Sequence, residues 1–518
     1  MANRAAPTIA STRREAPGKS TAAAMRAQAD SKFPSAVRFA ALLVTLVAAP
    51  ADAVALEGVR TAIVGGGASG LLLAHRLLDE GATVSLFESR ADPRHSNSLE
   101  GRAYALGLGL RGRTALRTVD ERLWKDVAAS GFASDRFTLH LPFGSFDLRK
   151  PDPAQEPSIL IYQTALCSAM LSSLEERHAA SGRLFMNFEC RVETVDARTG
   201  AVCVAPLAGS APAIETFDLV CGCDGVNSAV RAAVAEQSLA FNAELTTLPG
   251  SLKVLRLDAM PSTLTPDAVH LVPGAGGMAA FLEPTANGAC ALISWQTPTG
   301  RSDGRSDAID PGALTDADET RRFLASSFPL ISTALNQTDV GAQFVAQRIS
   351  RASTVRCNTY HFGQVVLLGD AAHSTGGASG QGCNSALADA AALATMLTEA
   401  RARRRTQTPA AVAAALARYS RERLPEGHAL LDLSVGPSRA LSPLSRLLGV
   451  LGTLKDTLLF KLGVGEPPLQ TLLTTSLKSF AQIRREREWN YGPFPTDAEF
   501  DAQIARATAT EEQILERV

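Results

Sequence analysis

Residues 59–90, VRTAIVGGGASGLLLAHRLLDEGATVSLFESR, read as a buried strand, a glycine turn, a leucine-rich helix and a second strand. The glycines follow the spacing of Gly65, Gly67 and Gly70 in GxGxxG. The first permits a tight turn, the second lets the backbone approach a pyrophosphate, and the third lets helix and strand pack closely. The free N–H groups at the helix start, beside Ser69, then face the anion. We therefore predict a parallel α/β sheet that binds a dinucleotide through these four residues.

Glu88 closes the second strand of the same unit. A carboxylate at this position can accept hydrogen bonds from the ribose hydroxyls of an adenosine. The strand before the glycines, the helix after them and this acid all match a dinucleotide site. The pattern fits NAD and FAD equally well.

Residues 217–234, FDLVCGCDGVNSAVRAAV, read as a buried strand, an Asp224-Gly225 turn and a helix capped by Ser228. We expect Arg231, one turn further on, to meet an acid or a phosphate. Taken alone, the segment fits a plain capped turn equally well. Cys221 and Cys223 would share one face of the strand, so we expect them to pack there and predict no metal site.

Residues 365–397 run from the apolar VVLL through Gly369 and Asp370 into a glycine-rich loop and an Ala/Leu-rich helix that begins near Gly382. A strand-end Asp beside the N–H groups of a helix start offers an acceptor for sugar-like hydroxyls and a dipole for an electron-rich ring. This arrangement suits a ribityl chain that leads into an isoalloxazine ring. FAD is therefore the expected cofactor.

The chain has 518 residues, enough for two or three domains whose core needs neither disulfides nor a structural metal. Its 51 Lys and Arg residues balance 52 Asp and Glu residues, so nothing favours nucleic acid or a strongly charged partner. The eight cysteines are scattered, which indicates a reduced interior. We expect a small-molecule partner.

The first 57 residues differ in composition from the rest. Residues 1–35 are rich in Arg, Lys, Ala, Ser and Thr and poor in acids, as organelle transit peptides are. The following AVRFAALLVTLVAAPADA resembles the hydrophobic part of a signal sequence and is too short for a comfortable membrane span. We predict a presequence over 1–57 that directs the protein to a plastid, with the thylakoid as one destination. A mitochondrial presequence and an N-terminus with one buried hydrophobic turn are the alternatives.

The three motifs, in this order, resemble the fingerprints of the FAD-dependent aromatic hydroxylases of the para-hydroxybenzoate hydroxylase class. The resemblance covers residues 59–435, and within the class the kynurenine hydroxylases are the most similar in their motifs. The local likenesses are GRAYALGLGLRGRTAL (101–116), DLVCGCDGVNSAVR (218–231), STVRCNTYHFGQVVLLGDAAH (353–373), GQGCNSALADA (380–390) and YSRERLPEGHALLDLS (419–434).

The resemblance implies a mixed α/β fold. A Rossmann-like FAD-binding domain of the glutathione-reductase type would span 58–235 and 350–435, an antiparallel substrate-domain sheet 236–349, and a helical region 436–518. The strand-like runs SLKVLRLDAM, DAVHLVP, GMAAFLEP and GACALISWQ agree with that sheet. We expect the amphipathic segment 441–463 to pack inside the protein, with contact to a membrane as the alternative.

The resemblance also assigns site residues. Gly369 and Asp370 would bind the ribityl chain, and the loop with Gly380, Gln381, Gly382 and Asn384 would lie beneath the flavin. Asn384 and the helix start would face the pyrimidine end of the ring, where negative charge collects on reduction. Further cofactor contacts are expected at Arg102, Gln163 and Asp224. The expected catalytic residues are Asn384, Gln381 and Arg136, the last matching a carboxylate-binding Arg of the family; His373 is expected to be structural, with proton transfer as the alternative.

The implied reaction has two halves. NAD(P)H reduces FAD, and the reduced flavin takes up O₂ as a C4a-hydroperoxide whose distal oxygen passes to an aromatic or conjugated small molecule. Members of the class use no second GxGxxG motif for NAD(P)H, and none follows here. The alternatives on the same fold are an isoprenoid epoxidase, a prenyl-chain reductase and a flavin-binding redox protein without turnover.

The sequence departs from the family near the expected substrate. Relatives carry proline at the position of Gly377, where it would fix the backbone; glycine frees φ, so we expect looser oxygen-transfer geometry or a bulkier substrate. Val435 to Ser438 replace an Asn-Tyr pair that helps kynurenine hydroxylases hold their substrate, and the C-terminal IRRERE (483–488) lacks a family Tyr. Kynurenine itself is therefore not the expected substrate.

Overall fold

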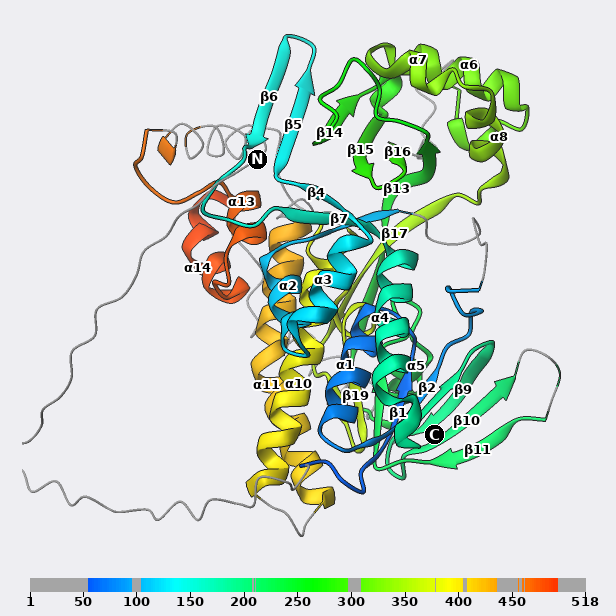
Figure 1. Cartoon of the computed structure of the whole chain (residues 1–518), viewed down its shortest axis with the longest axis vertical. Helices are drawn as coiled ribbons and strands as arrows, with labels where there is room; N and C mark the ends of the chain where they lie inside the picture. Colours follow the sequence, from blue (N-terminus) through cyan, green and yellow to red (C-terminus); the bar gives the residue numbers. More distant parts are fainter. Residues whose placement is uncertain are drawn as a thin grey trace, which may run out of the picture. The chain divides into compact units, whose positions relative to one another are not determined.

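The GxGxxG unit forms a strand, a turn and a helix at the centre of a parallel sheet (Figure 1). The structure, a computed structural model, describes residues 55–95, 104–206, 209, 211–296, 309–377, 379–403, 408–435, 455, 459–460 and 462–491. Nearly all of the predicted presequence, Arg102 and most of segment 441–463 lie outside the described residues.

The central sheet has the strand order β18-β19-β12-β1-β2-β8. Its strands are β1 (Arg60–Val64), β2 (Thr83–Phe87), β8 (Leu184–Asn187), β12 (Leu219–Gly222), β18 (His361–Phe362) and β19 (Val365–Leu367). All neighbours pair in parallel except β18 with β19. The near-continuous apolar runs of β1, β12 and β19 are buried on both faces, as parallel strands require. The predicted mixed α/β fold is confirmed.

Helices cover this sheet and are listed here with their bounds: α1 (Ala68–Asp79), α2 (Leu110–Arg117), α3 (Glu121–Ala129), α4 (Gln163–His178), α5 (Ala229–Gln237), α9 (Asp370–His373), α10 (Gly382–Arg403) and α11 (Thr408–Val435). Helix α1 packs against α10 and α4, and α10 runs beside α11 (Figure 1). The fully buried leucines of α1 and α10 join the sheet in the largest apolar cluster of the described residues.

A seven-stranded sheet has the order β17-β13-β16-β15-β14-β5-β6. Its strands are β5 (Arg136–Leu141), β6 (Gly144–Arg149), β13 (Ala243–Leu257), β14 (Ala268–Pro273), β15 (Ala279–Thr285), β16 (Gly288–Gln296) and β17 (Ser350–Cys357). Neighbours pair antiparallel except β14 with β5. The four runs predicted as strands are β13 to β16. Strands β5 and β6 lie inside the range 58–235 that we predicted for the FAD-binding domain, yet they join this sheet.

Residues 317–346 contain three α-helices, which the prediction of a sheet over 236–349 did not include. They form α6 (Ala317–Ser327), α7 (Ser332–Leu335) and α8 (Thr338–Ala346), which pack on one face of the seven-stranded sheet. Asp316 caps α6 by accepting a hydrogen bond from the Glu319 N–H, with acids in the first turn. These are ordinary helix-start signals.

Smaller elements complete the described fold. One three-stranded sheet contains β3 (Ala105–Leu108), β7 (Ser158–Tyr162) and β4 (Phe132–Ser134), and another contains β11 (Ala213–Thr216), β10 (Ala201–Pro206) and β9 (Cys190–Asp196). Short 3₁₀ helices are η1 (Ala179–Ser181), η2 (Ala275–Gly277), η3 (Pro311–Ala313) and η4 (Pro329–Ile331).

Two helices follow in the C-terminal part, α13 (Leu469–Thr475) and α14 (Phe480–Tyr491), and α14 packs on α11. The Glu426 carboxylate of α11 accepts hydrogen bonds from the Ser479 hydroxyl and from the N–H groups of Phe480 and Ala481. It thereby caps the start of α14. Within the residues that the structure describes, no helix combines the length and apolar character that a membrane crossing needs.

Candidate active site

The turn between β1 and α1 leaves no room for side chains at two of the three GxGxxG glycines. Gly65 has φ +106°, and a Cβ there would lie 2.3 Å from the Cys223 carbonyl oxygen. A Cβ on Gly70 would lie 2.1 Å from the Gly65 carbonyl oxygen. A Cβ on Gly67 would meet nothing within 4 Å, so this backbone is open to a ligand. The open position is the one predicted to approach a pyrophosphate.

Glu88 follows the last residue of β2 and is buried. Its Oε2 accepts a hydrogen bond of 2.8 Å from the Gly66 N–H, which ties it to the glycine turn. Its Oε1 accepts hydrogen bonds from the backbone N–H and the Nε of Arg90, at 2.8 and 2.9 Å. Burial alone would raise the pKa of Glu88, but Arg90 and the Gly66 N–H outweigh it and lower the pKa. The carboxylate therefore remains an anionic acceptor at the place expected for a ribose.

The three sequence motifs meet at the ends of neighbouring strands. Gly369 follows β19 with φ +57°, and a Cβ on it would lie 2.9 Å from the Ala386 Cβ of α10 and 3.5 Å from the Ser69 Oγ of α1. The Ser69 hydroxyl also hydrogen-bonds the Cys223 side chain after β12. The glycine turn, the Asp-Gly motif and the Gly-Asp motif thus form one site.

Asp224 is part of this site. Its Oδ2 accepts a hydrogen bond from the Val230 N–H at 3.2 Å, and its Oδ1 is buried without a partner among the described residues. Burial raises its pKa. The Arg231 guanidinium donates to the carbonyl oxygens of Ala371 and Val226, at 2.9 and 2.7 Å, and so links two motifs. Its expected contact with an acid or a phosphate stays a prediction. Ser228 caps α5 as predicted.

The loop before α10 brings further polar groups to the same place. A Cβ on Gly382 would lie 3.8 Å from the Asp370 Oδ1, so Asp370 stands beside the start of α10. The Gln381 Oε1 is buried without a partner among the described residues. Gly380 has φ +66°, and nothing lies within 4 Å of a Cβ built on it. An open backbone next to a helix start and two polar side chains suits a ring with polar edges.

The Asn384 side chain has a different role from the one expected. Its Oδ1 accepts hydrogen bonds from the N–H groups of Gly109 and Gly112, at 2.9 and 3.2 Å, and its Nδ2 donates to the Gly107 carbonyl at 2.8 Å. The residue is fully buried. The amide therefore joins α10 to β3 and α2, and only its backbone can face a bound ring. A direct catalytic contact by this side chain does not fit these hydrogen bonds.

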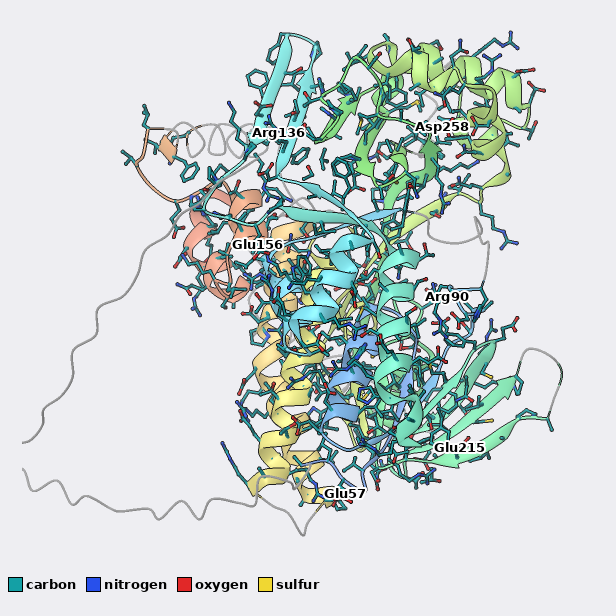
Figure 2. All side chains as sticks on the ribbon, viewed as in Figure 1. Glu57, Arg90, Arg136, Glu156, Glu215 and Asp258 are labelled. Carbon is teal, nitrogen blue, oxygen red and sulfur yellow. The ribbon has the colours of Figure 1, made fainter. Side chains whose placement is uncertain are left out.

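Two further predicted residues, Gln163 and Arg136, lie on elements outside the three motifs. Gln163 begins α4 and is half-buried. Arg136, at the start of β5, is exposed and pairs with Asp267, the Nε to Oδ2 distance being 3.2 Å (Figure 2). Their roles stay predictions.

Next to the Gly-Asp motif lies a buried network of charged side chains that the sequence motifs did not indicate. The Asp389 carboxylate accepts from the His373 Nε2 at 2.5 Å and from the Arg423 Nε at 2.7 Å. Burial would raise the pKa of Asp389, but His373 and Arg423 outweigh it and lower the pKa to about 2. Because its Nε2 is engaged here, His373 fits the structural role predicted for it. No local spacing in the sequence joins these residues, since the fold brings α9, α10 and α11 together.

A family model described as an FAD binding domain matches residues 58–434. Kynurenine 3-monooxygenase of Salinispora arenicola (strain CNS-205) is 32% identical over 383 residues, which are 72% of this chain and 78% of the relative. The chain belongs to the family of FAD-dependent monooxygenases. The violacein synthase of Chromobacterium violaceum is 27% identical over 340 residues, 64% of this chain and 76% of the relative.

Solved structures of this family share the fold. PqsL of P. aeruginosa in complex with 2-aminobenzoylacetate superimposes with a TM-score of 0.57 at 22% identity, covering 76% of this chain and 100% of that one. For a monooxygenase of this family the motif site fits FAD. The open backbone at Gly67 suits the pyrophosphate, the Glu88 carboxylate the ribose, and Asp370 with the start of α10 the ribityl chain and the ring.

Proposed function

We propose that this monooxygenase uses NAD(P)H and O₂ to hydroxylate an aromatic or conjugated small molecule. The observation that carries the proposal is the meeting of all three motifs at one site, with the loop before α10 beside the seven-stranded sheet. That loop is tied to β17, because the Val355 N–H donates to the Ser374 carbonyl at 2.9 Å and Thr354 pairs with Thr375. We therefore expect the substrate to bind between the seven-stranded sheet and the flavin-facing loop.

Bound FAD supplies the electron transfer and the activation of oxygen. The chain's own residues position it: Glu88 accepts from the ribose hydroxyls, and Asp370 accepts from the ribityl chain. The backbone N–H groups at the start of α10 stabilise negative charge at the pyrimidine end of the ring. The buried network of Asp389 holds the Gly-Asp helix α9 against α10 and α11.

An aromatic or conjugated substrate is supported by the side chains on the sheet. Phe281 of β15 lies opposite Leu292 of β16 and Leu271 of β14. All three are half-buried, as is Phe137, whose ring centre lies 5.9 Å from that of Phe281 in an edge-to-face arrangement. A flat apolar molecule would cover this surface and keep water from the reacting atoms. The substrate names of the relatives agree with this class, but the departures near Val435 favour a molecule other than kynurenine.

The proposal is tested with purified protein. We expect it to be yellow, to bind FAD, and to oxidise NADH or NADPH faster when an aromatic substrate from a panel of aromatic acids, quinone precursors and pigments is added, with matching O₂ uptake. Flavin reduction that is coupled to saturation of a prenyl chain, without O₂ uptake, would favour the reductase alternative. Bound flavin that neither NADH nor NADPH reduces would contradict enzymatic turnover.

We also propose that residues 1–57 direct the protein to a plastid. The support is their basic, acid-poor composition followed by a short apolar run. A fusion of residues 1–58 to a fluorescent protein should accumulate in plastids, whereas mitochondrial or cytosolic fluorescence would contradict the proposal. Contact with a membrane through segment 441–463 stays a prediction.

A further inference from the structure

One face of the seven-stranded sheet carries an acid and a base that make no contact with each other. Arg256 of β13 lies opposite Cys290 of β16, and Cys290 lies opposite Glu283 of β15. Residues directly opposite on neighbouring strands project from the same side of a sheet. The other side, which includes Leu255 and Leu282, packs on α6 to α8. Arg256, Cys290 and Glu283 therefore project away from these helices.

Tyr162 at the end of β7 meets this face. It packs against the buried cluster that contains Cys290, and its hydroxyl hydrogen-bonds the Thr285 side chain. The Arg256 Cζ lies 5.0 Å from the centre of the Tyr162 ring. Thr285 and Glu283 are two residues apart on β15, so they share a face. The side chains of Arg256, Glu283, Cys290 and Thr285 form one cluster around Tyr162.

The cluster lies close to the loop that borders the flavin site. Tyr162 pairs with Ala105 of β3. Two residues further along β3, the Gly107 carbonyl accepts the hydrogen bond from Asn384 at the start of α10. A single short strand therefore connects the cluster with the helix start that faces the flavin ring.

Glu283 is only 7% exposed and has neither a hydrogen-bond donor nor a cation as partner among the described residues. Burial raises its pKa to about 8. The Arg256 Nε is likewise buried and has no acceptor in the described part of the chain. Two strand spacings, roughly 10 Å, separate their backbones, which explains why the two side chains do not pair. Buried polar groups without partners are costly, and they are typical of sites that bind a ligand.

We propose that Arg256 and Glu283 form a substrate subsite for an aromatic ring that carries an acceptor oxygen beside a hydroxyl or amino donor. Arg256 donates to the oxygen, and Glu283 accepts from the donor. The inference rests on the proposed function, because this ligand is the substrate of that reaction. It narrows the substrate class from any aromatic molecule to one with an adjacent acceptor and donor.

Four probes separate the two contacts. Anthranilate and salicylate carry both groups, benzoate keeps only the acceptor, and aniline keeps only the donor. Binding to the FAD-loaded protein is followed by the change in flavin absorbance. At a pH above about 8, where Glu283 is charged, we expect anthranilate and salicylate to bind about tenfold more tightly than benzoate or aniline, because each lost hydrogen bond to a charged group costs at least that factor.

The affinity for anthranilate should rise with pH through about 8, as Glu283 loses its proton and becomes a stronger acceptor. The other titratable groups that face it do not lose a proton there. Burial raises the pKa of Tyr162 and of Cys290 to about 12 in each case.

Variants assign the effects to residues. Glu283→Leu should bring anthranilate down to the affinity of benzoate, and the nearly isosteric Glu283→Gln should remove the pH dependence. Arg256→Met should weaken the binding of anthranilate, salicylate and benzoate about tenfold and leave the binding of aniline unchanged. Asp258→Asn, which alters an exposed carboxylate just after β13, is the matched control and should match the wild type (Figure 2). Flavin content and thermal melting show that each variant is folded.

Equal affinity for all four probes, no measurable binding of any probe, or wild-type behaviour of both Glu283 variants would overturn the subsite. Its failure is distinct from failure of the proposed function. Probe discrimination without NAD(P)H oxidation contradicts only the reaction. Substrate-stimulated oxidation with O₂ uptake, but without probe discrimination, contradicts only the subsite.

Discussion

At the scale of single residues, Glu88 is expected to contribute directly to the affinity for FAD. Its carboxylate is buried, held by Arg90 and the Gly66 N–H, and kept anionic by a lowered pKa. Glu88→Gln should weaken FAD binding about tenfold, since a charged acceptor for the ribose becomes a neutral one. Titration of the apoprotein with FAD measures the change. Glu215→Gln on the exposed β11 is the control, and an unchanged FAD affinity of the Glu88 variant would rule out the ribose contact (Figure 2).

The buried carboxylate of Asp389 predicts a pH-dependent stability. Its pKa is lowered from its ordinary 3.8 to about 2, so its contribution is complete above pH 3.8 and is lost as the pH falls through about 2. Asp389→Asn breaks a buried ion pair, and should lower the free energy of unfolding by about 3–5 kcal/mol at neutral pH. The difference from the wild type should shrink below about pH 4.

Urea unfolding at a series of pH values measures this difference, with Asp126→Asn as the control. Asp126 is half-exposed and its ion pair with Arg122 is 3.7 Å long, so its substitution should change little. A constant difference between Asp389→Asn and the wild type down to pH 2 would contradict the linkage.

The positive φ of Gly377 predicts how its loop responds to proline, the residue that the family resemblance leads us to expect at this position. Its φ is +80°, whereas proline is restricted to about −65°. Gly377→Pro should therefore cost about 1–3 kcal/mol of stability or force the loop into another shape. A Cβ at this position would meet nothing within 4 Å, so Gly377→Ala should cost about 1–2 kcal/mol of stability from the positive φ alone. Thermal melting of both variants is the measurement, and a proline variant more stable than the wild type would show that the loop takes a different φ.

The residue-level predictions succeeded where a local backbone demand decides the residue. Gly65, Gly70 and Ser228 have the conformations or contacts that their spacing predicts. Asn384 was placed less well because Gly107, Gly109 and Gly112, which its side chain contacts, lie far away in the sequence. Arg256 and Glu283 leave no local signal, since the register between strands brings them to one face.

At the scale of elements, the docking of α14 on α11 depends on a cap supplied by another helix. The Glu426 carboxylate accepts from the Phe480 N–H at 2.8 Å and from the Ala481 N–H at 3.2 Å. Glu426→Ala should loosen α14 by about 1–2 kcal/mol, the typical value of a lost helix cap. Hydrogen exchange of the α14 amides should accelerate while those of α10 stay protected. Glu422→Ala, one turn earlier on α11, is the control, and equal exchange in the two variants would contradict the capping role.

Elements with strong local patterns were predicted and those defined by long-range pairing were not. The alternating runs of β13 to β16 carry their own strand signals. Strands β5 and β6 belong to the seven-stranded sheet only through pairing of β5 with β14, far away in the sequence. Helix α6 begins at an ordinary capping signal, Asp316, whereas α7 and α8 begin without a side-chain cap.

At the scale of the whole molecule, the parallel sheet holds the cofactor motifs and the seven-stranded sheet offers the apolar and polar side chains for a substrate. The loop from Gly369 to Asn384 connects them, because it starts at β19 and also contacts β17 and β3. This arrangement predicts oxygen transfer rather than flavin binding alone. It also predicts that FAD stabilises the whole fold by mass action.

The most direct test is incorporation of oxygen from labelled ¹⁸O₂ during turnover of the FAD-loaded protein. Purified protein is supplied with NADPH or NADH and with the aromatic compounds that most strongly accelerate flavin reduction, and the products are weighed by mass spectrometry. The account predicts a product that carries one ¹⁸O atom per molecule, with oxidation of the nicotinamide matching O₂ uptake. Bound FAD that is reduced and reoxidised while every aromatic compound returns without label would contradict it.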